Sequence, residues 1–279
     1  MAEMNEIRPS PIAGSWYSDD PQVLAGQIDG YLEDAELPAI QGEIVGLIAP
    51  HAGYRYSGPT AGYAYASVEG LRFDRVVIAS PYHQFYDADL LISGHSAYRT
   101  PFNDVPIDTP MLMEIAEKIK QEGITVQQVT YDEEHSLEIQ LPFLQRVLSQ
   151  PFKLLPFMVR TQELNQVRGI AKMIAEGIKG NNALLVASTD LSHFYTAQDA
   201  QQLDQEMLQR IEKFSPEKVL EAERDGCASA CGAGAVATIL ETAKYLGANK
   251  VQVLHYATSA ESSGDYSSVV GYGAAVITK

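Results

Sequence analysis

The chain has 279 residues and a formal net charge of −16, with 36 acidic residues against 20 Lys and Arg. This length suits one large α/β domain or two small ones, and a hydrophobic content of 46% excludes a disordered chain. The acidic balance argues against a nucleic-acid binder and against docking on an anionic membrane, because both need basic patches. We therefore expect no nucleic acid and no membrane among the partners.

Cysteine usage and the N-terminal residues predict a cytoplasmic location. The two cysteines, Cys227 and Cys231, are too few for a disulfide scaffold, which favours a reducing compartment. Residues 1–17 contain no apolar segment of the kind that a signal peptide needs. No apolar run approaches the roughly 18 residues of a membrane span.

The first 40 residues are predicted to form a lead-in segment, with a loop at 13–20 and a helix at 21–35 packed on the body. Short, continuously apolar and β-branched runs follow, which are typical of strands buried on both faces. Seven strands are predicted, at 43–49, 74–80, 88–93, 152–159, 183–188, 251–257 and 268–277.

Amphipathic segments with start and stop signals alternate with these strands. Pro59 suits the first turn of a helix at 59–69, and Thr196 with Asp199 resembles a capping box for 197–213. Pro142 should kink a helix at 136–149 or shift its start. Further helices are predicted at 110–123, at 162–179 and from Cys231 to about 246.

This alternation predicts an α/β fold with a central mixed or mostly parallel sheet flanked by helices. The sequence has no linker rich in Pro, Gly and Ser, and no internal repeat. We therefore expect residues 1–279 to form a single domain.

Histidines follow three of the predicted strands. His51 comes after 43–49, His83 after 74–80, and His193, with Asp190, after 183–188. Ligands of open α/β sheets bind beyond the carboxyl ends of the strands, and the chain has only six histidines. The placement predicts one shared site.

Cys231 precedes a glycine-rich helix start, a position that favours thiolate over thiol. Two imidazoles and a thiolate suit iron(II), copper or zinc, and they do not suit magnesium or calcium. Three protein ligands leave a coordination position open, as catalytic metal sites do.

Each of these residues also has an ordinary structural explanation. His51 and His83 could be turn histidines, Cys231 a small buried residue and Asp190 a capping group. Cys227, His95 and His255 are interpreted as structural. The Asp190, Ser192 and His193 trio does not indicate a serine hydrolase, since the sequence has no G-x-S-x-G.

Two further stretches are predicted to contribute to a substrate pocket. Glu134 and His135 precede Ser136, a candidate helix N-cap, and could lie over the same site. Among the tyrosines that follow His51, Tyr54 is assigned to the pocket wall.

Eight ordered stretches together resemble the Memo family, from about residue 8 to the C-terminus. They are GSWY, APHAGYRYSG, SPYHQF, YRTPF, DEEHSLEIQLPF, STDLSHF, CGAGAV and SSVVGYGAAV. The resemblance implies a fold similar to the class III extradiol ring-cleaving dioxygenases, which use non-haem iron(II). It also implies prokaryotic companions, a radical-SAM protein and an AMMECR1-like protein.

Carried over by motif, the resemblance implies a metal site made by His51, His83 and Cys231. His193 would take the place of the acid/base histidine of the dioxygenases, with Asp190 beside it. The third dioxygenase ligand is a carboxylate, so a thiolate here departs from the usual triad and leaves iron or copper redox chemistry open. The stretch PYHQF has one histidine where some relatives have two.

Three functions remain open from the sequence. The first is a dioxygenase-like redox enzyme that binds iron or copper. The second is a scaffold whose cleft binds a small molecule, a peptide or a partner protein without catalysis. The third is a zinc-dependent hydrolase on the same ligands.

Overall fold

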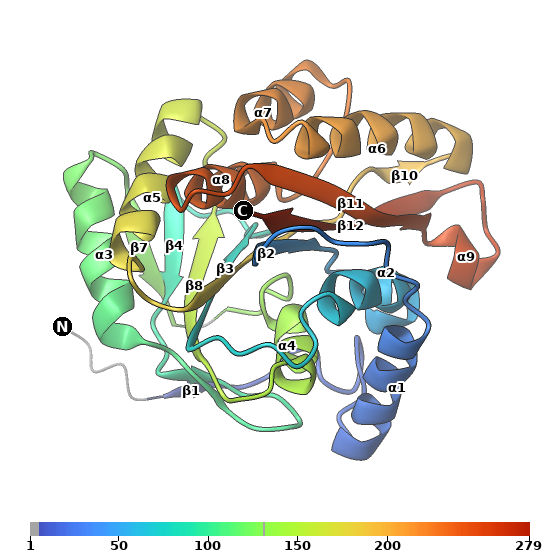
Figure 1. Cartoon of the computed structure of the whole chain (residues 1–279), viewed down its shortest axis with the longest axis horizontal. Helices are drawn as coiled ribbons and strands as arrows, with labels where there is room; N and C mark the ends of the chain where they lie inside the picture. Colours follow the sequence, from blue (N-terminus) through green and yellow to red (C-terminus); the bar gives the residue numbers. More distant parts are fainter. Residues whose placement is uncertain (1–5, 131) are drawn as a thin grey trace.

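A mixed β-sheet lies between two layers of helices in the computed structural model, which describes residues 6–130 and 132–279 (Figure 1). Within these residues, nine strands form one sheet in the order β10-β12-β2-β9-β3-β8-β4-β7, with β11 paired along β12. The strands are β2 (Ile44–Ala49), β3 (Arg75–Ser80), β4 (Leu90–Ser93), β7 (Val126–Val129), β8 (Lys153–Val159), β9 (Ala183–Ser188), β10 (His193–Tyr195), β11 (Lys250–Thr258) and β12 (Val269–Thr278).

The centre of the sheet is parallel. Strands β2, β9, β3 and β8 run in one direction, and their residues are buried almost throughout, as continuous apolar runs require. Strand β12 is antiparallel to β2, and β4 is antiparallel to β8. All seven predicted strands are confirmed within two residues at each end. The carboxyl ends of β2, β3 and β9 therefore meet at one edge.

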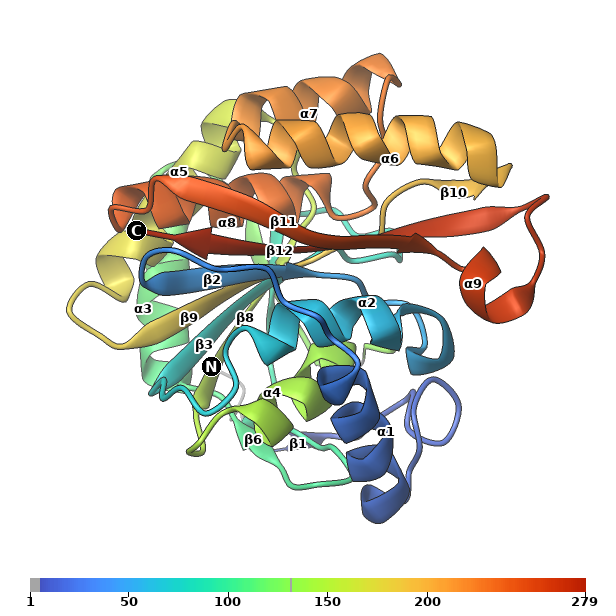
Figure 2. The same cartoon turned by 45° about the vertical axis from the view of Figure 1, so that its right-hand side comes forward.

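Helices cover both faces of the sheet (Figure 2). One face carries α1 (Pro21–Glu33), α2 (Tyr54–Ala66) and α4 (Leu141–Val147), and the other carries α3 (Thr109–Gln121), α5 (Leu164–Gly177) and α8 (Ala233–Tyr245). Helices α6 (Ala197–Glu212) and α7 (Pro216–Asp225) pack outside α8 and the β11–β12 hairpin. One apolar core joins these layers, consistent with the predicted single α/β domain.

The lead-in segment is anchored to the body in two places. Helix α1 buries Leu24 and Ile28 against α2, and β1 (Ile7–Arg8) pairs with β5 (Ala97–Tyr98) in a small second sheet. Strand β6 (Val105–Pro106) completes that sheet. Residues 1–5 of the predicted segment lie outside the described residues.

One helix start differs from the prediction, and another is shifted as predicted for Pro142. Helix α2 begins at Tyr54, directly after the loop, and Pro59 lies inside it. The missing amide of Pro59 removes one hydrogen bond, to the carbonyl of the exposed Arg55, which water can replace. Pro142 instead shifts a helix start, because a 3-10 turn at Glu138–Gln140 precedes α4 and Pro142 lies in the first turn of α4.

Several short elements were not predicted, namely β1, β5, β6, β7, β10, α7 and α9 (Ala260–Ser263). Strands of two to four residues show no measurable alternation of apolar and polar residues. Helix α7 does carry a signal, since Ser215 caps it and Pro216 opens it. Among the described residues, no helix is both long and apolar enough to cross a membrane.

Candidate metal centre

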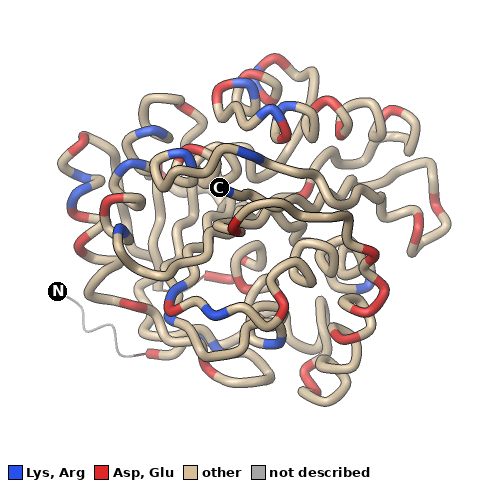
Figure 3. Tube along the Cα trace, viewed as in Figure 1, with Lys and Arg blue, Asp and Glu red and all other residues tan. Residues whose placement is uncertain are grey.

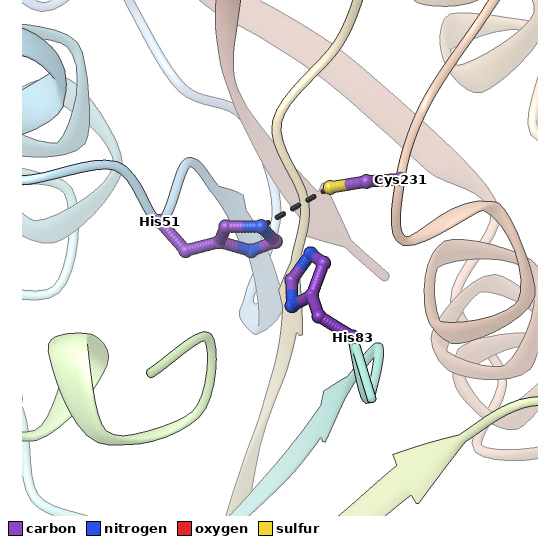
Figure 4. A group of neighbouring side chains, drawn as sticks. All are labelled: His51, His83 and Cys231. Atoms are coloured by element: carbon purple, nitrogen blue, oxygen red, sulfur yellow. Dashed lines mark hydrogen bonds between the residues drawn. The ribbon is translucent and has the colours of Figure 1, made fainter. Parts of the chain in front are cut away.

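His51, His83 and Cys231 come together where the central strands end. His51 follows β2, His83 follows β3, and Cys231 precedes α8. One potential ligand atom from each lies within 4.8 Å of the others. The two imidazole rings and the thiol point toward a common space (Figure 4). The sequence-predicted metal ligands are thus neighbours in the fold.

The hydrogen bonds of Ser188 determine the tautomer of His51. The Ser188 hydroxyl donates to the carbonyl of Ser136 at 2.6 Å and accepts from Nε2 of Gln140 at 2.8 Å. Because its only proton is used, Ser188 accepts from Nδ1 of His51, at 3.0 Å. Nε2 of His51 therefore carries the lone pair, and it lies 3.1 Å from Sγ of Cys231.

Burial keeps His51 neutral. The residue is 1% exposed, and burial together with the imidazoles of His135 and His83 holds its pKa well below the usual value. A neutral imidazole with a free Nε2 lone pair is the form that binds a metal ion.

Cys231 is placed by close contact between backbones. A Cβ atom on Gly232 would lie 2.5 Å from the Ser188 carbonyl oxygen, so only glycine permits this approach. The amide of Asp190 donates to Sγ at 3.3 Å. Burial and the Asp190 carboxylate raise the pKa of Cys231, so it is a thiol until a metal ion displaces the proton, and not the thiolate that its helix start predicted.

His83 is oriented by a buried carboxylate. Glu134, 3% exposed, lies 2.9 Å from Nδ1 of His83 and accepts the His83 amide at 2.6 Å. Burial alone would raise the pKa of Glu134, but the hydrogen bonds from His83 and Ser136 lower it below its usual range. Since Glu134 is a carboxylate, Nδ1 of His83 donates and Nε2 is left for a ligand.

His83, Glu134 and His135 form a second group of close ligand atoms. The rings of His83 and His135 are stacked, with centroids 4.7 Å apart and planes 16° apart. Their lone pairs therefore lie in two nearly parallel, separated planes, which keeps them from converging on one ion. We interpret Glu134 as the group that orients His83, and His135 as a neighbour whose pKa burial lowers to about 4.

Asp190 orients the loop of His51. Its Oδ1 accepts the amide of His51 at 2.6 Å, and burial raises its pKa to about 7. His193 is oriented separately, since its Nδ1 lies 2.8 Å from the carbonyl of Leu191 and must donate to it. Asp190 and His193, which the resemblance placed side by side, are therefore held by different hydrogen bonds.

Other residues singled out in the sequence lie elsewhere. Tyr54 is a core residue, 3% exposed, and its hydroxyl donates to the carbonyl of Ile139. Ser136 donates to the carbonyl of Pro81 and caps no helix. His255, in β11, stacks on Tyr63 of α2, and Cys227 is exposed beside Arg210.

Sequence reasoning missed Trp16, Ser188 and Asp204. The Trp16 ring lies 4.2 Å from that of His135, and it comes from the GSWY stretch, which holds the only tryptophan of the chain. Buried Asp204 accepts the amide of Ser192 and the hydroxyl of Tyr256. A charged residue on the apolar face of a predicted helix is the signal that could have found it.

Comparisons with known proteins cover nearly the whole chain. The model of the Memo-like protein family matches residues 8–276. The chain belongs to the Memo family. A Memo family protein of Nitrosopumilus maritimus is 34% identical and covers 96% of this chain and 98% of its own. Relatives from Sulfolobus acidocaldarius and Aquifex aeolicus are 34% and 33% identical, each covering 95% of this chain and 97% of its own.

A solved structure shares the fold of this Memo family member. The crystal structure of an uncharacterised protein of Escherichia coli K12 superposes with a TM-score of 0.53 at 10% sequence identity. It covers 85% of this chain and 100% of its own. The likeness confirms the α/β fold.

The residues fit the metal that the Memo resemblance implies. Two imidazole nitrogens and a sulfur face one another, and each imidazole has its other nitrogen hydrogen-bonded. This is the arrangement that metal-binding histidines show in general. The donor set suits iron(II), copper or zinc.

Proposed function

We propose that this Memo family protein binds a redox metal, iron or copper, through Nε2 of His51, His83 and Sγ of Cys231. The observation that carries the proposal is the convergence of these ligand atoms within 4.8 Å, with the His51 tautomer already set by Ser188. A site with preset tautomers needs little rearrangement to bind an ion.

A bound iron or copper ion would supply one-electron and oxygen chemistry at this site, and three protein ligands leave room for a substrate. His83 has an exposed side chain, which marks the accessible side of the group. The protein would contribute ligand orientation through Ser188 and Glu134. Its class would be a dioxygenase-like oxidoreductase.

His193 is the proposed acid/base residue. Its Nδ1 donates to Leu191, so Nε2 keeps a lone pair. Burial lowers its pKa, and the imidazole is therefore neutral and able to accept a proton near neutral pH. Asp190 would support it indirectly by holding the His51 loop beside it.

The partner proteins and the cellular location of this protein are further proposals. The low cysteine count suggests a cytoplasmic protein, and the family resemblance suggests that it works with radical-SAM and AMMECR1-like proteins. A scaffold that binds a peptide or partner protein in the same cleft is the alternative. It does not require Cys231, so partner binding that survives Cys231→Ser would favour it.

The test is the metal content of protein purified without oxygen, measured by elemental mass spectrometry. We expect close to one iron or copper per chain in the wild type and a loss in His51→Ala and Cys231→Ser. His255→Ala and Cys227→Ser are matched controls, because neither residue belongs to the group, and they should retain the metal.

Two results would contradict the proposal. Zinc in place of iron or copper, retained after reconstitution with each metal, would favour the hydrolase. Metal-free protein that also fails to bind added iron or copper would leave only a cleft for another ligand.

A further inference from the structure

A pocket of 550 Å³ borders the candidate metal centre, in the size range of small-molecule sites. Ala52 and Gly53, which follow His51, line it, and so does Phe194, which follows His193. Trp16 also lines it and contacts the ring of His135. The pocket is thus lined by the immediate neighbours of His51 and His193 in the chain.

Phe194 is held in this pocket at a cost in backbone energy. Its φ is 65°, in the left-handed region that glycine and asparagine favour, and its side chain is 78% exposed. The β10–β12 pairing shifts register between His193 and Tyr195, so Phe194 occupies a bulge. Bulges beside active sites re-aim side chains, and here His193 is buried in part while Phe194 turns outward.

Tyr272 supplies an unused polar group. The residue is 2% exposed and lines the pocket, yet its hydroxyl has no hydrogen-bond partner in the described part of the chain. Burial and the nearby charge of Asp190 raise its pKa, so the hydroxyl remains protonated. The hydroxyl itself is open to the pocket and not sealed in the core, so a ligand or water can complete its hydrogen bonds.

The charge of the lining limits which ligands can bind. Among the described residues, Asp265 is the only charged side chain in the lining, which otherwise offers aromatic rings, hydroxyls and small groups. Acidic residues are also spread over the outer helices (Figure 3). Arg55 is a cation near the pocket, because its Cζ lies 5.6 Å from the ring centre of Tyr56, which lines the pocket. Arg55 itself does not line the pocket.

We infer that this pocket selects an aromatic compound without negative charge, stacked on Phe194 and Trp16 and hydrogen-bonded through a polar substituent to Tyr272. The inference rests on the proposed function in that the pocket would present this compound to the metal group. Rings favour aromatic partners, and Asp265 together with the rings favours an amine over a phosphate.

Trp16, the only tryptophan, reports binding directly by fluorescence. We would titrate the full-length protein, with and without added metal, with tyramine and with phenyl phosphate. Tyramine should change Trp16 emission saturably, and phenyl phosphate should bind at least tenfold more weakly. Phe194→Gly should weaken tyramine about threefold to tenfold, as a lost ring contact implies. Tyr272→Phe should weaken it about fivefold, as a lost hydrogen bond implies.

Controls separate a lost contact from a lost fold. Phe194→Gly relieves the left-handed strain, so this variant should melt no lower than the wild type. Tyr245→Ala removes a half-exposed ring at the end of α8, outside this pocket, and should bind tyramine as the wild type does. Arg55→Ala should leave the preference for tyramine over phenyl phosphate intact.

The outcomes distinguish this inference from the metal proposal. Tyramine binding that the pocket variants weaken, in protein that binds no metal, supports the pocket and overturns only the metal site. Equal or tighter binding of phenyl phosphate, or tyramine binding unaffected by Phe194→Gly and Tyr272→Phe, would overturn the inference even if metal is bound.

Discussion

Ser188 accepts a hydrogen bond from Nδ1 of His51 because its own proton is committed to the carbonyl of Ser136. This relationship joins the end of β9 to the loop after β2 and makes Nε2 the only ring atom of His51 that can bind a metal. The tautomer is therefore a property of the fold, present before any ion arrives.

Removing this hydroxyl should weaken metal binding more than it weakens the fold. We expect Ser188→Ala to lower metal affinity about 10- to 100-fold, the usual effect of losing a group that orients a ligand. Competition with a chelator measures the affinity. Thr238→Ala, which removes a buried hydroxyl bonded only within α8, is the matched control and should keep wild-type affinity. Equal affinity in Ser188→Ala would contradict the tautomer argument.

The Glu134–His83 pair predicts a pH-dependent effect in metal-free protein. Glu134 raises the pKa of His83, so the pair stabilises the fold while His83 is protonated, and this contribution is lost as pH rises through that raised pKa. The lowered pKa of Glu134 keeps the carboxylate charged at mildly acidic pH. Glu134→Gln should therefore cost more stability near about pH 5.5 than near about pH 8.5.

Urea unfolding at the two pH values measures this difference. Glu133→Gln changes the exposed neighbouring carboxylate and should show no such dependence. A Glu134→Gln effect that is the same at both pH values would show that His83 is not charged beside Glu134.

Arg8 should be essential to the lead-in segment. Its guanidinium, 1% exposed, binds the carboxylates of Asp132 and Glu138 and donates to the carbonyl of Glu134 at 2.7 Å. Arg8→Ala leaves two buried carboxylates without a cation, which should cost about 3–5 kcal/mol in unfolding free energy. Denaturant unfolding measures this. A loss under about 1 kcal/mol, the size of an exposed pair, would mean that the network is solvated.

Asp204 should position the segment that carries His193. Asp204→Ala leaves the amide of Ser192 without its acceptor and should cost about 2 kcal/mol. Asp204→Asn keeps an acceptor for that amide, so it should retain most of the stability. Thermal unfolding compares the two variants. Similar losses in both would assign the effect to charge, since the asparagine preserves shape.

The strand ends that carry the site could be read from local patterns. Apolar runs of six to eight residues predicted the central strands, and the position of His51, His83 and His193 just beyond them predicted one shared site. The strands are confirmed, and His51 and His83 do lie together, because parallel neighbours end at one edge whatever their order. Cys231 followed from the glycines at its helix start, one of which, Gly232, contacts Ser188.

Pairings between distant residues depended on the tertiary structure. Glu134 meets His83 across 51 residues and Ser188 meets His51 across 137, and no periodicity encodes such distances. Tyr54 was placed in the pocket wall because it follows His51, yet the helix that begins there turns its ring into the core. Asp190 likewise binds the His51 loop and not its near neighbour His193.

The sequence thus determined which residue types stand at the strand ends, because burial and backbone preferences act locally. The tertiary structure alone decided tautomers, orienting partners and the pocket of Trp16, Phe194 and Tyr272. These depend on strand order and on hydrogen bonds between segments that only folding brings together.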